Sequence, residues 1–522
     1  MIDTPALPNA ITITWISRGL LVLALTAFGD WLFYDRIVGL SLALFLIALA
    51  ATVPLTNTVQ TDWRARGLAF AVLILGLLPL LEDVGVLAVL FGIGGLLGSM
   101  VLMTGGLAPG RLATLGAVRR MLVAGPFQIV TDLTAGMSRQ LAAGAPRWRW
   151  QPIIGWVTPI LLGALFALLF AAANPVIDAW LSAVSWSSLQ PRISVGRALT
   201  WLILAALAWP FVTVRRRYPA RTASPEADAP SAVPVGIAAA LGLGPAVILR
   251  CLVLFNLLFA LQSTLDILFL WGGLALPAGV TYAAYAHRGA YPLIVTALLA
   301  AAFVLTVMSP GGPGERLPLI RRLVYLWIGQ NVLLVISAIL RLDLYVAAYS
   351  LTLVRAAALI WMGLVAGGLM LIVARIALRR SNGWLLAANA ALLTLVLYAC
   401  AFANLAALIS DYNVAHSREL GGGGGSFDLA YAMRLGPDAL PAVDRYIAVA
   451  TGPNRAAAIH WRVRAARETA RTMQDWRGWT FRNWRLARYL AATPAPPPAP
   501  TPDVALPGGD GALPDGGAAG PR

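Results

Sequence analysis

The sequence predicts an all-α protein: a polytopic transmembrane helix bundle with a small C-terminal helical subdomain and a disordered tail. Composition is the first indication, because 59% of the 522 residues are hydrophobic and only 12% are charged. A water-soluble domain usually has about a quarter charged residues. The second indication is that apolar runs of about twenty residues recur, each long enough to cross ~30 Å of hydrocarbon as a helix. A lipid bilayer is therefore the solvent that suits this chain.

The apolar runs predict about eleven transmembrane spans. We place them at residues 11–27, 37–54, 67–81, 84–103, 153–173, 195–214, 246–271, 289–308, 323–340, 353–372 and 384–409. The polar stretches at residues 30–36 and 82–83 are short, so they predict tight turns between neighbouring helices.

Arginine in the loops predicts the orientation, since short cytoplasmic loops carry an excess of basic residues. One alternate set of loops is rich in arginine and is expected to be cytoplasmic; it includes Arg64, Arg66, Arg119, Arg120, Arg215, Arg216, Arg217, Arg321, Arg322, Arg379 and Arg380. The other set holds few, among them Arg36, Arg288 and Arg341. We therefore expect a bacterial inner (plasma) membrane protein with a cytoplasmic N-terminus and an extracytoplasmic C-terminal region.

The predicted domains are a transmembrane helix bundle at residues 1–409, an extracytoplasmic helical subdomain at 410–490 and a disordered Pro/Ala/Gly tail at 491–522. Within the bundle, residues 106–151 predict a cytoplasmic interfacial segment, and residues 218–234 predict a flexible linker. In the subdomain, Gly436 predicts the end of one helix and Asp438 the N-cap of the next. The GGGGGS run at residues 421–426 resembles an engineered linker but is equally compatible with a native loop.

Several kinds of site are excluded or disfavoured. Every basic residue is an arginine, so a Schiff-base lysine and a Walker-type phosphate loop are absent. Two cysteines, Cys251 and Cys400, lie in apolar runs, and three scattered histidines predict no metal site. No cofactor is expected. The glycine run at residues 92–98 lies inside an apolar stretch, which favours close helix packing over a dinucleotide loop.

The net charge of +16 predicts contact with anionic lipid head groups as well as membrane lipid in general. Near the C-terminus, tryptophans and a phenylalanine alternate with arginines between residues 476 and 488. Such a pattern can bind single-stranded nucleic acid. Outside the cell membrane this partner is absent, so we expect the segment to lie on lipid or on the helix bundle, and we expect no nucleic acid.

One predicted span carries a candidate polar face inside the membrane, made of Asn256, Gln262, Ser263 and Asp266. Their spacing puts most of them on one side of a helix, where Gln330 and Asn331 of a later span could meet them. Two interpretations stay open: hydrogen bonding between helices, and a polar pathway or catalytic cleft. We expect Asp266 to point into the bundle and to pair with Arg288, Arg355 or another helix.

A second candidate site is the outer loop that follows this span, with Tyr282, Tyr285, His287, Arg288 and Tyr291. His287 could carry a proton and Arg288 could bind an anion. The alternative is an interfacial belt of aromatic residues with a snorkelling arginine. We expect the loop to fold back against the bundle, because its backbone groups need protein partners near the bilayer.

Residues 261–266, 271–273 and 281–289 resemble an uncharacterised family of bacterial membrane proteins, domain of unknown function 4173, which is closely allied to 4153. The regions around Asn174-Pro175 and residues 411–413 resemble it too. The resemblance implies a multi-span architecture and no established activity. The chain departs from the family pattern at Ala284, where a glutamate commonly stands, so no carboxylate role can operate there.

Three function classes remain open. A transporter or flippase-like protein is favoured by the number of spans and by the polar face. A membrane-embedded enzyme acting on a lipid-linked substrate at the outer face is the first alternative, and an envelope sensor or scaffold is the second. The sequence predicts neither a catalytic residue nor an oligomeric state.

Overall fold

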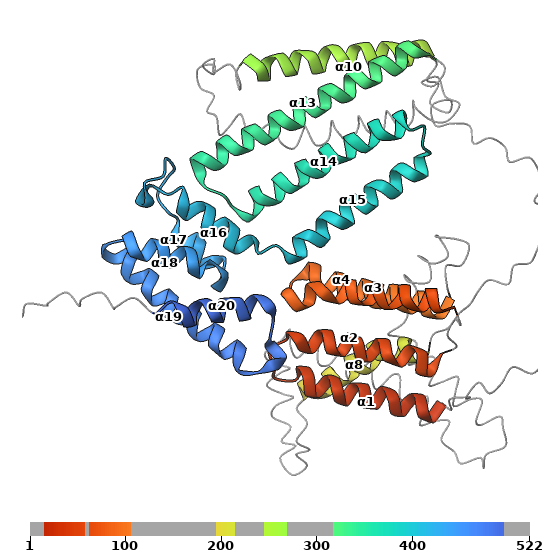
Figure 1. Cartoon of the computed structure of the whole chain (residues 1–522), viewed down its shortest axis with the longest axis vertical. Helices are drawn as coiled ribbons and strands as arrows, with labels where there is room; N and C mark the ends of the chain where they lie inside the picture. Colours follow the sequence, from red (N-terminus) through yellow and green to blue (C-terminus); the bar gives the residue numbers. More distant parts are fainter. Residues whose placement is uncertain (1–14, 58–61, 106–194, 214–244, 269–316, 495–522) are drawn as a thin grey trace, which may run out of the picture.

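The computed structural model describes residues 15–57, 62–105, 195–213, 245–268 and 317–494 (Figure 1). All elements in this part of the chain are helices, which confirms the all-helical class for these residues. The predicted spans 153–173 and 289–308 lie outside the described residues, as do the interfacial segment, the linker and most of the tail.

The N-terminal helix group packs around its own hydrophobic core. It consists of α1 (Trp15–Phe33), α2 (Leu40–Thr56), α3 (Trp63–Glu82), α4 (Val86–Gly105) and α8 (Val195–Val212). Fully buried side chains such as Leu32, Val53 and Val212 fill this core. Helices α3 and α4 approach closely, because a Cβ atom at Gly76 would lie only 2.7 Å from the Cα of Gly95. The glycine run therefore acts in helix packing, as predicted.

The C-terminal helix group has a separate core. Its helices are α10 (Pro245–Asp266), α13 (Pro318–Tyr349), α14 (Leu353–Ala377) and α15 (Asn382–Phe402). Ile248 and Leu252 of α10 pack with Ile320, Val324 and Trp327 of α13. The two groups meet where α15 packs against α3 and α4: the Tyr398 hydroxyl donates to the Leu75 carbonyl at 2.8 Å, and its ring contacts Phe91.

Beyond α15 the chain forms a compact unit of short helices, the C-terminal subdomain (residues 405–492). It comprises α16 (Leu405–Ala415), η2 (Arg418–Leu420), α17 (Leu429–Arg434), η3 (Pro437–Ala439), α18 (Leu440–Val449), α19 (Gly452–Gln474), η4 (Trp476–Gly478) and α20 (Phe481–Ala492). Buried Leu440, Val443 and Leu486 lie in its core. Figure 1 places this subdomain at one end of both helix groups.

Among the described residues, six helices are long and apolar enough to cross a membrane, namely α3, α4, α10, α13, α14 and α15. The chain is therefore membrane-integral, while a total of about eleven spans stays a prediction. Several boundaries differ from the sequence prediction by a few residues, and two differ most. Helix α13 continues through Arg341 to Tyr349, and the predicted span 384–409 is broken at Ala403 and Asn404, where the Asn404 side chain caps α16.

Candidate functional site at the junction of the subdomain and the helix groups

The predicted intramembrane polar face lies partly between α10 and α13. The side-chain amide of Asn256, which is buried, donates to Leu252 O at 2.7 Å and to Leu323 O at 3.2 Å. Gln330 donates in turn to the carbonyl of Asn256 at 3.1 Å. These amides bond to backbone groups of their own or the adjacent helix, which favours the interpretation as interhelical hydrogen bonding.

The other predicted site residues are less defined. Gln262 is half-buried on α10, and the buried Ser263 hydroxyl has no hydrogen-bond partner among the described residues. Asp266 ends α10, and its side chain lies outside the described part of the structure. Tyr282, Tyr285, His287, Arg288 and Tyr291 also lie outside it, so the outer-loop site stays a prediction.

Sequence reasoning missed two buried arginines. Arg341 was expected in an outer loop but lies inside α13, and Arg375 lies inside α14; their exposures are only 7% and 4%. A buried guanidinium needs partners. Helical spacing gave only a weak signal, since Arg341 lies ten residues after the buried Asn331 and therefore about 80° around α13 from it.

The subdomain joins the C-terminal helix group through apolar packing and a few hydrogen bonds, including one from the Leu353 N–H to the Tyr431 hydroxyl at 2.8 Å. Val346, Leu351 and Ala356, around the α13–α14 turn, form a buried cluster with Ile409 of α16. Asn413 of α16 bonds to both backbone groups of Leu351. This junction excludes water, so the subdomain and the C-terminal helix group form one packed unit.

The subdomain meets the N-terminal helix group through mostly polar contacts. The backbone N–H of Leu40, at the start of α2, donates to Trp479 O at 2.9 Å. The Arg477 guanidinium lies 4.2 Å from the centre of the Trp31 ring and donates to Trp31 O at 3.1 Å. Segment 476–488 thus lies partly on the helix bundle, one of the two places predicted for it. No buried apolar cluster among the described residues spans this junction.

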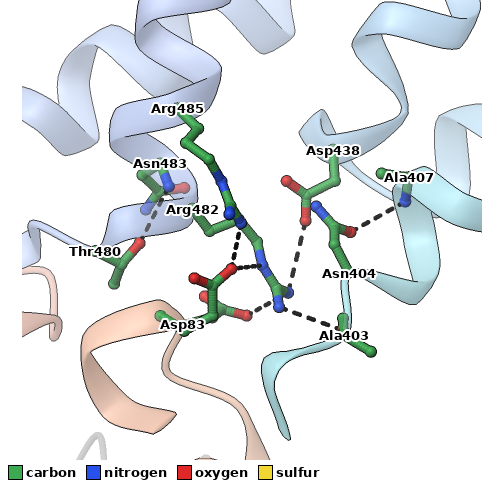
Figure 2. A network of polar contacts seen from close by, with 10 residues as sticks. Asp83, Ala403, Asn404, Ala407, Asp438, Thr480, Arg482, Asn483 and Arg485 are labelled. Atoms are coloured by element: carbon green, nitrogen blue, oxygen red, sulfur yellow. Dashed lines mark hydrogen bonds and ion pairs between the residues drawn. The ribbon is translucent and has the colours of Figure 1, made fainter. Parts of the chain in front are cut away.

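The most charged part of the junction is the Arg482 cluster, defined here as Glu82, Asp83, Asp438, Arg482 and Arg485 (Figure 2). From α20, Arg482 donates to Asp83 at 2.8 Å and lies 3.6 Å from Glu82 and 3.8 Å from Asp438. It also donates to Ala403 O, at the end of α15, at 3.4 Å. Arg485 pairs with Glu82. One guanidinium therefore contacts both helix groups and η3.

Asp438 has an unusual environment in this cluster. It was predicted to cap a helix but lies within η3 and makes no capping bond. Burial raises the pKa of its carboxyl above the ordinary value of 3.8, while Arg482 and a hydrogen bond from Asn404 partly oppose this. The sequence contains both partners, an acidic turn at 82–83 and arginines at 482 and 485. About 400 residues separate them, so no local pattern predicted their pairing.

No group of three His, Cys, Asp or Glu residues that could hold a metal ion occurs among the described residues. The Arg482 cluster instead offers charge pairing at a boundary between helical units.

The family model described as Domain of unknown function (DUF4153) matches residues 69–446. The chain belongs to this family. The sequence resemblance named a related but different family, 4173, so only the membership of an allied group was predicted correctly. The DUF4153 region includes Glu82, Asp83 and Asp438, whereas Arg482 and Arg485 lie beyond it. No curated protein and no solved structure matches the chain.

Proposed function

We propose that this DUF4153 protein is a flippase-like transporter that moves an amphiphilic, lipid-like substrate between the two leaflets of the membrane. The observation that carries the proposal is an asymmetry: the subdomain packs by apolar contacts on one helix group and is held to the other mainly by polar contacts. Polar contacts can exchange with water, whereas a dry apolar junction resists opening. The arrangement thus supports movement of one helix group relative to the other.

The separate cores support the same proposal. The N-terminal and C-terminal helix groups each bury their own apolar cluster, and no described cluster contains residues of both. Packed cores move as rigid bodies, so relative motion concentrates where packing is thinnest.

The packing between the two helix groups is thinnest at helix α15, which contacts α3 and α4. Only 11% of its most apolar stretch is buried, against 39% for α3 and 44% for α13. Its surface is apolar apart from a few hydroxyl and amide groups such as Asn389, Thr394 and Tyr398. A lipid-like molecule suits such a surface better than an ion, which would need several polar partners.

We also propose an orientation for the protein in the membrane. The turns that follow α1, α3 and α13 lie at the end of the helices that carries the subdomain (Figure 1). Arg64, Arg66, Arg321, Arg322, Arg379 and Arg380 flank the opposite helix ends. This distribution supports a subdomain outside a bacterial inner membrane, with the arginine-rich ends in the cytoplasm.

The test is a lipid-transfer assay in vesicles that contain the purified protein and a fluorescent phospholipid. Cys251 and Cys400 are first replaced by alanine. Phe91→Cys and Tyr398→Cys then place one thiol on each helix group, since these two rings are in contact. Linking the thiols with a short bismaleimide should stop transfer of the lipid between leaflets.

A matched control links two helices of the same group. Gly367→Cys and Leu392→Cys lie at a close contact between α14 and α15, and the same reagent should leave transfer unchanged. If the protein cross-linked between the two helix groups transfers lipid as fast as the unlinked protein, the proposal is contradicted. It is also contradicted if the unlinked protein transfers no lipid. The enzyme alternative rests on the outer loop, and the same assay would reveal it as chemically altered lipid.

A further inference from the structure

The Arg482 cluster carries unequal numbers of opposite charges. Glu82, Asp83 and Asp438 face only two guanidinium groups, those of Arg482 and Arg485. When all five groups are ionised the cluster therefore has a net charge of −1. Glu82 and Arg482 are largely buried, with side-chain exposures of 9% and 13%, so water screens this excess charge poorly.

Asp438 is the carboxylate with the longest contact to a guanidinium, although it also accepts a hydrogen bond from Asn404. Asp83 accepts a hydrogen bond from Arg482 at 2.8 Å and Glu82 pairs closely with Arg485, whereas Asp438 lies 3.8 Å from Arg482. A proton added to Asp438 brings the cluster to neutrality and leaves both strong pairs intact. Burial of the carboxyl favours the same protonation.

Charged groups on the other elements that pack against η3 are engaged elsewhere. Asp411 of α16 pairs with Arg445 of α18, and Asp444 of α18 pairs with Arg462 of α19. Within α17, the Arg434 guanidinium lies over the Tyr431 ring. The charges that act on Asp438 are those of Arg482, Asp83 and Arg485, all within the Arg482 cluster.

We propose that the Arg482 cluster is a proton-binding site in which uptake of one proton by Asp438 tightens the docking of the C-terminal subdomain on the N-terminal helix group. The ligand is a proton from the aqueous phase next to the subdomain. Its binding site is complete only when α20, η3 and the α3–α4 turn are together. This inference concerns docking alone and stands whether or not the protein transfers lipid.

The direction of the pH effect follows from linkage. Docking brings the Asp83 carboxylate beside Asp438 and adds to its burial, and both effects raise the pKa of Asp438, so the docked state binds the proton more tightly than the undocked state. Docking is strongest at pH values below the pKa of the undocked carboxyl, and this gain is lost as the pH rises through the docked pKa.

Asp475 affects docking in the opposite sense, but it does so at lower pH than Asp438. Its pKa lies below the ordinary value of 3.8, mainly because it accepts the backbone N–H of Arg477 in the same η4 segment. That bond persists on undocking, and only the Arg36 contact crosses the junction. Because the pKa of Asp475 is lowered and that of Asp438 is raised, Asp475 is already ionised over the pH range in which Asp438 loses its proton.

The backbone amide of Leu40 reports docking directly. As a residue of the first turn of α2 it has no partner in its own helix, and it donates to Trp479 O only while the subdomain is docked. We would measure hydrogen–deuterium exchange of peptides containing Leu40, at matched pH, for the wild type and for Asp438→Asn, which mimics the protonated carboxyl.

At neutral pH, Asp438→Asn should slow exchange at Leu40 relative to wild type. The factor should be about tenfold for each pH unit that separates the docked and undocked pKa values. The two proteins should converge as the pH falls. Asp411→Asn, an exposed carboxylate of the same subdomain outside the cluster, should follow the wild type at every pH.

Equal exchange of wild type and Asp438→Asn throughout, or faster exchange of the variant at neutral pH, would overturn the inference. A slowing by Asp411→Asn of the same size would overturn it too. If Asp438→Asn does not fold, the wild type suffices: its Leu40 protection, divided by that of core amides of α2, should rise as the pH falls, and a flat ratio would contradict the inference.

Discussion

Asn413 of α16 bonds to both backbone groups of Leu351 in the α13–α14 turn. Its side-chain oxygen accepts the Leu351 N–H at 2.7 Å, and its amide donates to the Leu351 carbonyl at 2.8 Å. One amide side chain thus satisfies a buried turn in which Ser350 has a positive φ of 67°. The relationship fixes the subdomain to the C-terminal helix group.

Replacing this amide should loosen the fixed junction. Asn413→Ala leaves the two backbone groups of Leu351 unsatisfied, which should cost about 1–3 kcal/mol of unfolding free energy. The measurement is thermal unfolding of the purified protein in detergent. Asn454→Ala, at an exposed position at the start of α19, should be neutral. Equal melting temperatures for Asn413→Ala and the wild type would show that the turn does not need the amide.

A methyl group at Gly39 should separate the subdomain from α2. A Cβ atom at Gly39 would lie 2.7 Å from Gly478 O, so a methyl group there must push the two backbones apart. Overpacking of this kind costs about 1–3 kcal/mol. Gly39→Ala should therefore increase proteolysis between the subdomain and the helices. Gly85→Ala, in the α3–α4 turn with nothing within 4 Å, is the matched control. Unchanged cleavage of Gly39→Ala would contradict the close contact.

Tyr489 should titrate far above free tyrosine. Its hydroxyl donates to Asp444 at 2.9 Å, and burial together with this carboxylate raises its pKa to about 12. The folded state therefore favours the neutral phenol. Its contribution to stability is present below the unfolded pKa of about 10 and is lost as the pH rises through about 12. Spectrophotometric titration should lose a step near pH 12 in Tyr489→Phe; an unchanged curve would refute the assignment.

The two ends of the bundle should face different compartments. In a protein without Cys251 and Cys400, Ala457→Cys in α19 and Arg380→Cys after α14 are both exposed positions. A membrane-impermeant maleimide added to intact spheroplasts should label Ala457→Cys and leave Arg380→Cys unlabelled until the membrane is broken. The reverse pattern would invert the proposed orientation.

Much of the helical architecture could be predicted from local sequence, and its long-range pairing could not. Apolar runs located the described helices of the two helix groups, but α15 ends at Phe402 because Asn404 caps the next helix within a continuous apolar stretch. Similarly, α13 continues through Arg341 and Asp343, since hydropathy falls there while helix propensity does not. The Arg482–Asp83 pair joins residues 399 positions apart, and no local pattern encodes such a pairing.

The central claim is that the subdomain moves with the C-terminal helix group and is held reversibly on the N-terminal one. Spin-label distances test it directly. One label pair joins Ala457→Cys to Val354→Cys, an exposed position at the start of α14, and the other joins Ala457→Cys to Gly85→Cys. Arg482→Ala should add a longer distance for the pair that includes residue 85 and leave the 354–457 distance single and narrow. Distances that stay the same for both pairs, or that broaden for both, would contradict the claim.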